Sequence, residues 1–191
     1  MPLERTSRHL HQHYRQSPDP WGHTTRVYER AKYERTLDAL GDRPVRQTVE
    51  IGCGIGALTE LLAPCVQAIF GIDCVPRAVE AARARLAGQP HVQLVAGIAP
   101  DDLPEFIADR IVLSEVLYFM AREEIVRLAV WCDAHAASDA RIIIVSWLGS
   151  TGEPLSGPAS ASIMREALAG WSHRQEEGNA FRIVLPDRLD G

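Results

Sequence analysis

The stretch Thr48-Val-Glu50-Ile-Gly52-Cys-Gly54-Ile-Gly56-Ala-Leu-Thr-Glu60 determines the fold that the sequence predicts. The apolar run that ends at Ile51 is typical of a buried strand, and the residues after Gly56 have the composition of a helix. A strand, a glycine turn and a helix in this order bring the main chain close to a ligand and direct free N–H groups toward it. An acidic residue, Glu50, precedes the first glycine by two positions. This turn is therefore the predicted centre of a binding site.

Apolar runs and helical segments alternate along the rest of the chain. Strands are expected at 45–51, 68–72, 91–96, 110–114 and 141–147, and helices at 24–40, 57–63, 76–87, 122–137 and 159–169. Near-continuous apolar strands separated by helices predict a parallel sheet that is covered on both faces. Two more strands, at 171–176 and 180–185, flank Glu177-Gly-Asn179 and predict an antiparallel hairpin at one edge. The expected fold class is thus α/β, with a mostly parallel sheet of seven strands.

The amino-terminal part of the chain differs in composition from the rest. Residues 1–20 are polar, and three histidines alternate between positions 9 and 13, a pattern that suggests either a metal site or, as we expect, a solvated and partly mobile arm. Prolines at 18 and 20 exclude a regular helix there. Thr24 or Thr25 is expected to cap the helix 24–40, and Gly41 to end it. We therefore divide the chain into an arm and lid helix, 1–40, and one compact domain, 41–191.

Composition limits the classes of partner. The 191 residues carry a net charge of −5, which argues against nucleic acid or an anionic membrane as the main partner, because phosphate binding depends on Lys and Arg. No apolar run approaches the length of about 18 residues that a transmembrane helix needs. The four cysteines lack zinc-binding spacing, so we expect free thiols and no metal. A cytoplasmic protein, monomeric or homodimeric, is the expectation.

Two interpretations of the glycine turn are compatible with its spacing. Gly52-x-Gly54-x-x-Ala57 satisfies the dinucleotide pattern, with Asp73 at the distance expected for a ribose hydroxyl. An acidic residue followed by three alternate glycines, ending at Gly56, instead matches the usual pattern for S-adenosylmethionine. Asp73 suits both ligands, because a carboxylate accepts two hydrogen bonds from a ribose diol.

Three features favour S-adenosylmethionine. The chain is short for a dinucleotide fold with a second mononucleotide-binding half. Glu50 would repel a pyrophosphate, whereas a sulfonium ligand carries no phosphate. The fourth strand ends in Ser114-Glu115-Val-Leu-Tyr118-Phe, a polar-acidic-apolar-apolar sequence expected beside the methionine moiety.

Four segments together resemble the rhizobial nodulation protein S group of class I methyltransferases: Asp19-Pro-Trp21, Tyr28-Glu-x-x-Lys32, the stretch 49–64 and Ser114-Glu-Val-Leu-Tyr-Phe. The resemblance covers about residues 17 to 170. It implies a Rossmann-like class I methyltransferase fold that uses S-adenosyl-L-methionine and releases S-adenosyl-L-homocysteine. It also implies N-methylation of a free amino group on a de-N-acetylated amino sugar or oligosaccharide. Methylation of oxygen on a small molecule, a small NAD-binding oxidoreductase and an inactive binding module remain alternatives.

The residue roles follow from the motifs and the resemblance. The predicted cofactor-binding residues are Trp21, Tyr28, Lys32, Glu50, Gly52, Cys53, Gly54, Gly56, Asp73, Cys74, Val75, Gly97, Ile98, Ser114 and Glu115. The predicted catalytic residues are Glu115, Tyr118 and His23, of which Glu115 or His23 would accept a proton from an amine. The loop Ala96-Gly97-Ile98 lacks the acidic residue that the superfamily often places there, so backbone groups of Gly97 and Ile98 are expected to meet the adenine.

Overall fold

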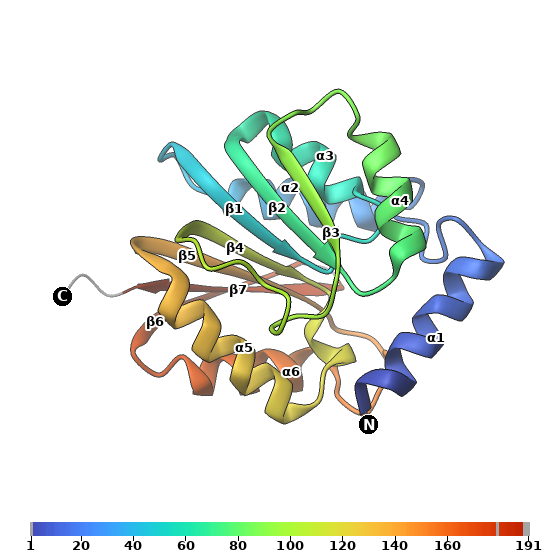
Figure 1. Cartoon of the computed structure of the whole chain (residues 1–191). Coiled ribbons are helices and arrows are strands. Elements are labelled where there is room, and N and C mark those ends of the chain that lie inside the picture. Colours follow the sequence, from blue (N-terminus) through green and yellow to red (C-terminus); the bar gives the residue numbers. More distant parts are fainter. Residues whose placement is uncertain (1, 179, 189–191) are drawn as a thin grey trace.

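The computed structural model describes residues 2–178 and 180–188, which form one seven-stranded sheet between two layers of helices (Figure 1). The strands are β1 Val45–Ile51, β2 Val66–Asp73, β3 Val92–Ala96, β4 Ala108–Ser114, β5 Ala136–Trp147, β6 Trp171–Glu177 and β7 Phe181–Arg188. Their order is β3-β2-β1-β4-β5-β7-β6. The first five strands are parallel, and β7 runs antiparallel to both of its neighbours. The predicted α/β class, strand number and edge hairpin are confirmed.

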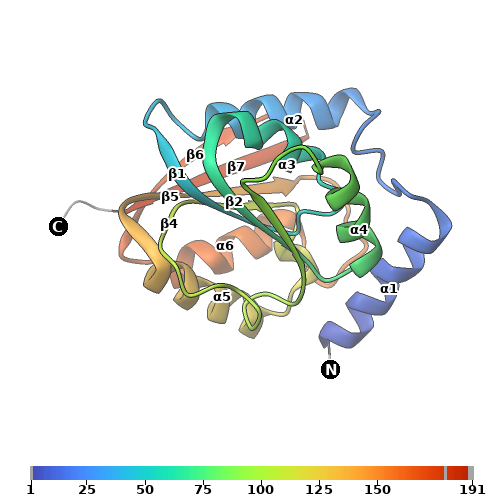
Figure 2. The same cartoon turned by 45° about the horizontal axis from the view of Figure 1, so that its top comes forward.

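Six α-helices surround the sheet: α1 Pro2–Gln16, α2 Val27–Asp38, α3 Ala57–Leu62, α4 Pro76–Arg85, α5 Arg122–His135 and α6 Gly157–Ala167. Short 3-10 turns lie at Ala63–Cys65 (η1) and Leu117–Phe119 (η2). Figure 2 shows α5 and α6 below the sheet, with α2, α3 and α4 on the other side.

The central strands are buried on both faces, which explains their near-continuous apolar sequences. In β4, Ile111 and Leu113 pack in the same core as α5 and α6, whereas Val112 between them packs with α3. All four cysteines lie in the described part of the chain and are free thiols, as predicted. Among the described residues, no helix is long and apolar enough to cross a membrane.

The amino-terminal arm is the main error of the sequence interpretation. Residues 2–16 form the helix α1 rather than a mobile arm, and Leu10 and Tyr14 are buried. These two residues are four positions apart, so they share one face of the helix and pack as a pair against the domain. Figures 1 and 2 place α1 beside α4, beyond the arrowheads of β1 and β2.

The lid helix α2 begins later than predicted, and neither Thr24 nor Thr25 caps it. Its N-cap residue is Arg26, which makes no side-chain capping bond. The Thr24 backbone N–H and hydroxyl both donate to Asp19, at 3.0 and 2.9 Å, so Thr24 stabilises the preceding turn instead. The helix ends at Asp38, and Gly41 follows with φ +78°, as expected for a glycine stop.

One other boundary differs clearly. Residues 136–140, predicted as the end of a helix and a loop, belong to β5, because Ala136 pairs with Ala108 before a register shift in which β5 carries the extra residues. This extension adds pairing at the amino end of β5 and leaves its carboxyl end, Trp147, where the sequence places it.

Candidate functional site

A cavity opens over the carboxyl ends of β1, β2 and β4, the edge at which open α/β sheets bind ligands. Most of the predicted site residues line it: Trp21, His23, Lys32, Glu50, Gly52, Cys53, Gly54, Asp73, Cys74, Val75, Gly97, Ile98, Ser114, Glu115 and Tyr118. Two predicted residues, Tyr28 and Gly56, do not line it. The wall also contains residues that the sequence did not single out, among them Leu10, Tyr14, Tyr33, Leu58, Phe119 and Met120.

The glycine turn has the backbone that its sequence demands. Gly52, Gly54 and Gly56 all have positive φ, between +53° and +79°. A Cβ on Gly52 would lie 2.9 Å from a methyl carbon of Val116, which explains why no larger residue fits at the end of β1. Gly56 serves a different purpose from the predicted contact with the ligand: a Cβ there would meet Ala82 of α4 at 3.0 Å. It therefore allows α3 to start close against α4.

Asp73 at the end of β2 ties the glycine turn to the next strand. Its Oδ2 accepts a hydrogen bond from the Gly54 N–H at 2.9 Å, and its Oδ1 accepts one from the Val75 N–H at 2.8 Å. Burial raises the pKa of Asp73, and these two N–H donors oppose the shift. Because each carboxylate oxygen has a second lone pair, Asp73 can still accept hydrogen bonds from a ligand.

Glu50 is a buried acid with a single hydrogen-bond partner in the described part of the chain. Its side chain lies on β1 and is only 2% exposed, and its Oε2 accepts a hydrogen bond from the Thr59 hydroxyl at 2.6 Å. Burial raises the pKa of Glu50 to about 7, while the Thr59 hydrogen bond acts in the opposite direction. A cationic group in the cavity would therefore find an acceptor that is ready to ionise.

Glu115, directly after β4, is held by the lid helix. It is the only described non-glycine residue with positive φ, at +56°. Its Oε1 accepts a hydrogen bond from the Tyr28 hydroxyl at 2.5 Å, and its Oε2 lies 2.8 Å from the Lys32 ammonium. Lys32 is 1% exposed and lies 5.2 Å from the ring centroids of Tyr28 and Tyr33. Tyr28 therefore hydrogen-bonds to Glu115 and does not itself line the cavity.

The same lysine continues into a buried ionic chain. Lys32 also donates to Glu29 Oε2 at 2.8 Å, and that oxygen lies 2.9 Å from His23 Nδ1. Against the cost of burial, the hydrogen bonds from His23 and Lys32 lower the pKa of Glu29 to about 2, so this carboxylate stays ionised. The Tyr33 hydroxyl lies 3.2 Å from the same His23 nitrogen. The chain runs from His23 on the lid segment to Glu115 on the sheet, and Glu29 was not predicted.

Aromatic side chains form the wall that faces the sheet. The Trp21 ring lies 5.3 Å from that of Tyr14 and 5.8 Å from that of His23. Asp19 organises this segment by accepting hydrogen bonds from the backbone of His23 and Thr24. The wall is therefore built from α1 and the 17–26 segment together.

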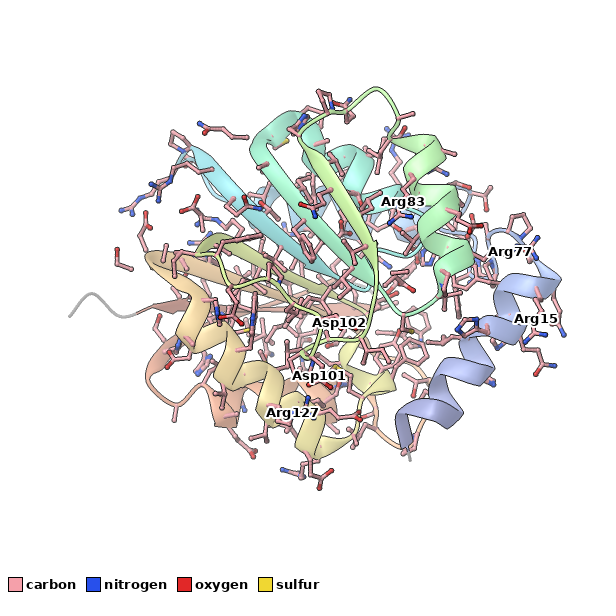
Figure 3. The ribbon with its side chains drawn as sticks, viewed as in Figure 1. Arg15, Arg77, Arg83, Asp101, Asp102 and Arg127 are labelled. Carbon is pink, nitrogen blue, oxygen red and sulfur yellow. The ribbon has the colours of Figure 1, made fainter. Side chains whose placement is uncertain are left out.

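The loop after β3 offers a partner that the sequence interpretation missed. The Ile98 N–H donates to Asp102 Oδ2 at 2.8 Å, and a Cβ on Gly97 would lie 2.9 Å from the Asp102 Cβ. Figure 3 shows Asp102 in this loop beside Asp101, which forms an ion pair with Arg127 of α5. The expected backbone contact of Ile98 with a ligand would thus compete with Asp102.

The alternating histidines do not assemble a metal site. His9 Nε2 and His13 Nε2 lie 3.0 Å apart on α1. Within the described part of the chain, no group of three His, Cys, Asp or Glu residues is arranged to hold a metal ion.

Comparison with known proteins identifies relatives. The family model of nodulation protein S matches residues 4–151. Nodulation protein S of Rhizobium tropici is 34% identical over 113 residues, which are 59% of this chain and 48% of that protein. The Sinorhizobium fredii protein of the same name is 32% identical over 113 residues, 59% of this chain and 52% of that protein. The chain thus spans about half the length of these curated relatives.

A solved structure shows the same fold. The N-methyltransferase NodS from Bradyrhizobium japonicum WM9, in complex with S-adenosyl-l-homocysteine, superposes with a TM-score of 0.84 at 23% identity. The superposition covers 96% of this chain and 98% of that chain. The Rossmann-like class I methyltransferase fold, expected from the sequence, is confirmed.

Proposed function

The chain belongs to the nodulation protein S family, and from that premise we propose that it methylates the free amino group of a de-N-acetylated amino sugar or oligosaccharide, with S-adenosylmethionine as methyl donor. The observation that carries the proposal is the pairing of two acids in one cavity: Glu50 beside the glycine turn, and Glu115 fixed by Tyr28 and Lys32. The first suits a cationic cofactor, and the second suits an amine acceptor.

The residues that line the cavity suit the charge of the cofactor. Gly54 leaves space between the glycine turn and α1, because a Cβ at this position would lie 3.1 Å from the Tyr14 hydroxyl. We assign the ribose hydroxyls to Asp73, the methionine ammonium to Glu50, and the adenine to the space between Cys74–Val75 and the loop after β3. S-adenosylmethionine supplies an activated methyl group, which an in-line displacement transfers.

The residues of the chain have defined tasks in that displacement. An attacking amine must be neutral, so its ammonium form has to lose a proton to a nearby acceptor. Glu115 is placed for this role, because its carboxylate lines the cavity and has its direction fixed by two donors on α2. Tyr118, on the turn after Glu115, lines the same region and is assigned to the acceptor side. Closure of the cavity by α1 and α2 excludes water, and the resulting alignment supplies much of the rate.

The charge of the cavity counts against a dinucleotide. Glu50, Asp73 and Glu115 line it, and Lys32 is the only lysine or arginine among the described lining residues. The Lys32 ammonium already forms ion pairs with two carboxylates, those of Glu29 and Glu115. A pyrophosphate would therefore meet acids without a free cation, whereas a sulfonium and an amine would be attracted.

Two measurements test the proposal. Calorimetry should show binding of S-adenosylhomocysteine and none of NAD; the reverse result would exclude a methyltransferase. A methylation screen read by mass spectrometry should then compare de-N-acetylated oligosaccharides with phenolic and carboxylate acceptors. Methylation of phenols without amines would refute the acceptor class. Glu115→Gln should retain S-adenosylhomocysteine binding but lose roughly 100-fold or more in amine methylation, the usual effect of removing a general base.

A further inference from the structure

The Tyr14 hydroxyl of α1 is a polar group of the cavity that no described residue pairs with. The Tyr14 side chain is only 5% exposed, yet among the described residues its hydroxyl makes no hydrogen bond. The hydroxyl points at the glycine turn, 3.1 Å from the position that a Cβ on Gly54 would take. A hydroxyl at the surface of a cavity can still form a hydrogen bond with a molecule that enters the cavity. Because the hydroxyl faces the cavity, a bound ligand can supply its missing hydrogen-bond partner.

The two walls of the cavity differ in what they offer a ligand. The sheet wall carries the carboxylates of Glu50, Asp73 and Glu115, which accept hydrogen bonds and attract cations. The opposite wall, made by α1 and the 17–26 segment, presents Tyr14 and Trp21. A ligand that carries both charges at its amino-acid end must place its ammonium toward the first wall and its carboxylate toward the second.

We infer that the Tyr14 hydroxyl donates a hydrogen bond to the carboxylate of the methionine portion of the methyl donor, which makes α1 part of the cofactor site; this rests on the proposed function. Two nitrogen donors near this wall are already engaged. Lys32 is bound to Glu29 and Glu115, and His23 Nδ1 is bound to Glu29. Burial and the nearby Asp73 raise the pKa of Tyr14, so its hydroxyl keeps its proton and remains a donor.

The prediction distinguishes this carboxylate contact from a general packing role. A hydrogen bond to a charged group contributes enough that its loss weakens binding roughly 10- to 100-fold. Tyr14→Phe should therefore bind S-adenosylhomocysteine at least about 10-fold more weakly than wild type. The same variant should bind decarboxylated S-adenosylhomocysteine, which lacks the carboxylate, within about twofold of wild type.

Calorimetry on the full chain with both ligands provides the test, and thermal unfolding checks that the variant is folded. Tyr33→Phe is the matched control, because the Tyr33 hydroxyl also borders the cavity but already contacts His23. Its ratio of the two affinities should equal that of wild type. An equal loss for both ligands in Tyr14→Phe, or unchanged S-adenosylhomocysteine binding, would overturn the inference alone. Failure of wild type to bind either ligand would overturn the proposed function as well.

Discussion

Replacing Glu50 with Gln should make the protein more stable at alkaline pH relative to wild type. The ordinary pKa of a glutamate is 4.5, and burial raises that of Glu50 to about 7. Between these pH values the folded protein keeps a proton that the unfolded chain has lost, so stability falls as pH rises from about 4.5 to 7. One pKa unit corresponds to about 1.4 kcal/mol, so ionised Glu50 costs the folded state about 3 kcal/mol. Gln is similar in size and does not titrate.

The assay is urea unfolding of both proteins from pH 5 to pH 8. The free energy of unfolding of the Glu50→Gln variant relative to wild type should increase by roughly 2 to 3 kcal/mol over this range. Comparing the two proteins at each pH cancels the titration of other groups, Asp73 included. Thr59→Val is a useful second variant: because the Thr59 hydroxyl stabilises the ionised form, its loss should move the transition to higher pH. A difference between wild type and Glu50→Gln that stays constant from pH 5 to 8 would refute the reasoning.

Ionisation of Glu50 should raise the affinity for the cofactor, although it lowers the stability of the folded protein. If ionised Glu50 meets the methionine ammonium, wild-type affinity for S-adenosylhomocysteine should rise roughly five- to tenfold between pH 6 and 7.5, as the ionised fraction increases. Glu50→Gln should bind more weakly and lose most of this dependence. If the wild-type affinity does not depend on pH, Glu50 does not bind the methionine ammonium. Together the two assays would show a residue that destabilises the folded protein in order to bind a cation.

Three further predictions concern the ionic chain and the cofactor site. Lys32→Met leaves the carboxylates of Glu29 and Glu115 without their cation, and urea unfolding should show a loss of about 3 to 5 kcal/mol in the free energy of unfolding. The Glu29→Gln/Lys32→Met double variant should recover part of this loss. An undiminished loss in the double variant would argue against the pairing of Glu29 with Lys32. Tyr28→Phe removes the short hydrogen bond to Glu115 and should lower the methylation rate about tenfold, with S-adenosylhomocysteine affinity unchanged by calorimetry; a fall in affinity instead would place Tyr28 at the cofactor. Asp73→Ala should weaken S-adenosylhomocysteine binding at least about tenfold, and unaltered affinity would remove Asp73 from the site.

Local sequence patterns were sufficient to predict most of the residues that line the sheet side of the cavity. Three glycines at alternate positions require a backbone that few other residues adopt, and all three have positive φ. Asp73 and Glu115 were predictable because each directly follows or ends a buried strand. The carboxyl ends of parallel strands meet at one edge of the sheet, so spacing along the chain becomes proximity in space.

The lid half could not be predicted in the same way. Lys32 and Tyr28 were predicted to be site residues, but nothing local to α2 shows that both would turn toward Glu115, more than 80 residues further along the chain. Leu10 and Tyr14 do have helical spacing, but they lie among polar residues, which made an arm the better expectation. Such contacts depend on where a helix docks, and docking is decided by the tertiary fold.

Glu50 and Glu115 lie in one cavity but have different protein partners. Among the described residues, Glu50 has a neutral hydroxyl as its only hydrogen-bond partner, so its charge is costly until a ligand brings a cation. Glu115 already has a cation, Lys32, and a phenol, and its left-handed backbone costs of order 1 to 3 kcal/mol that these contacts help to offset. Because both of those contacts come from α2, the position of Glu115 depends on the docked lid helix. If Glu115 accepts the proton, as we propose, its position for that role depends on the docking of α2, whereas Glu50 is held within the sheet by β1 and Thr59.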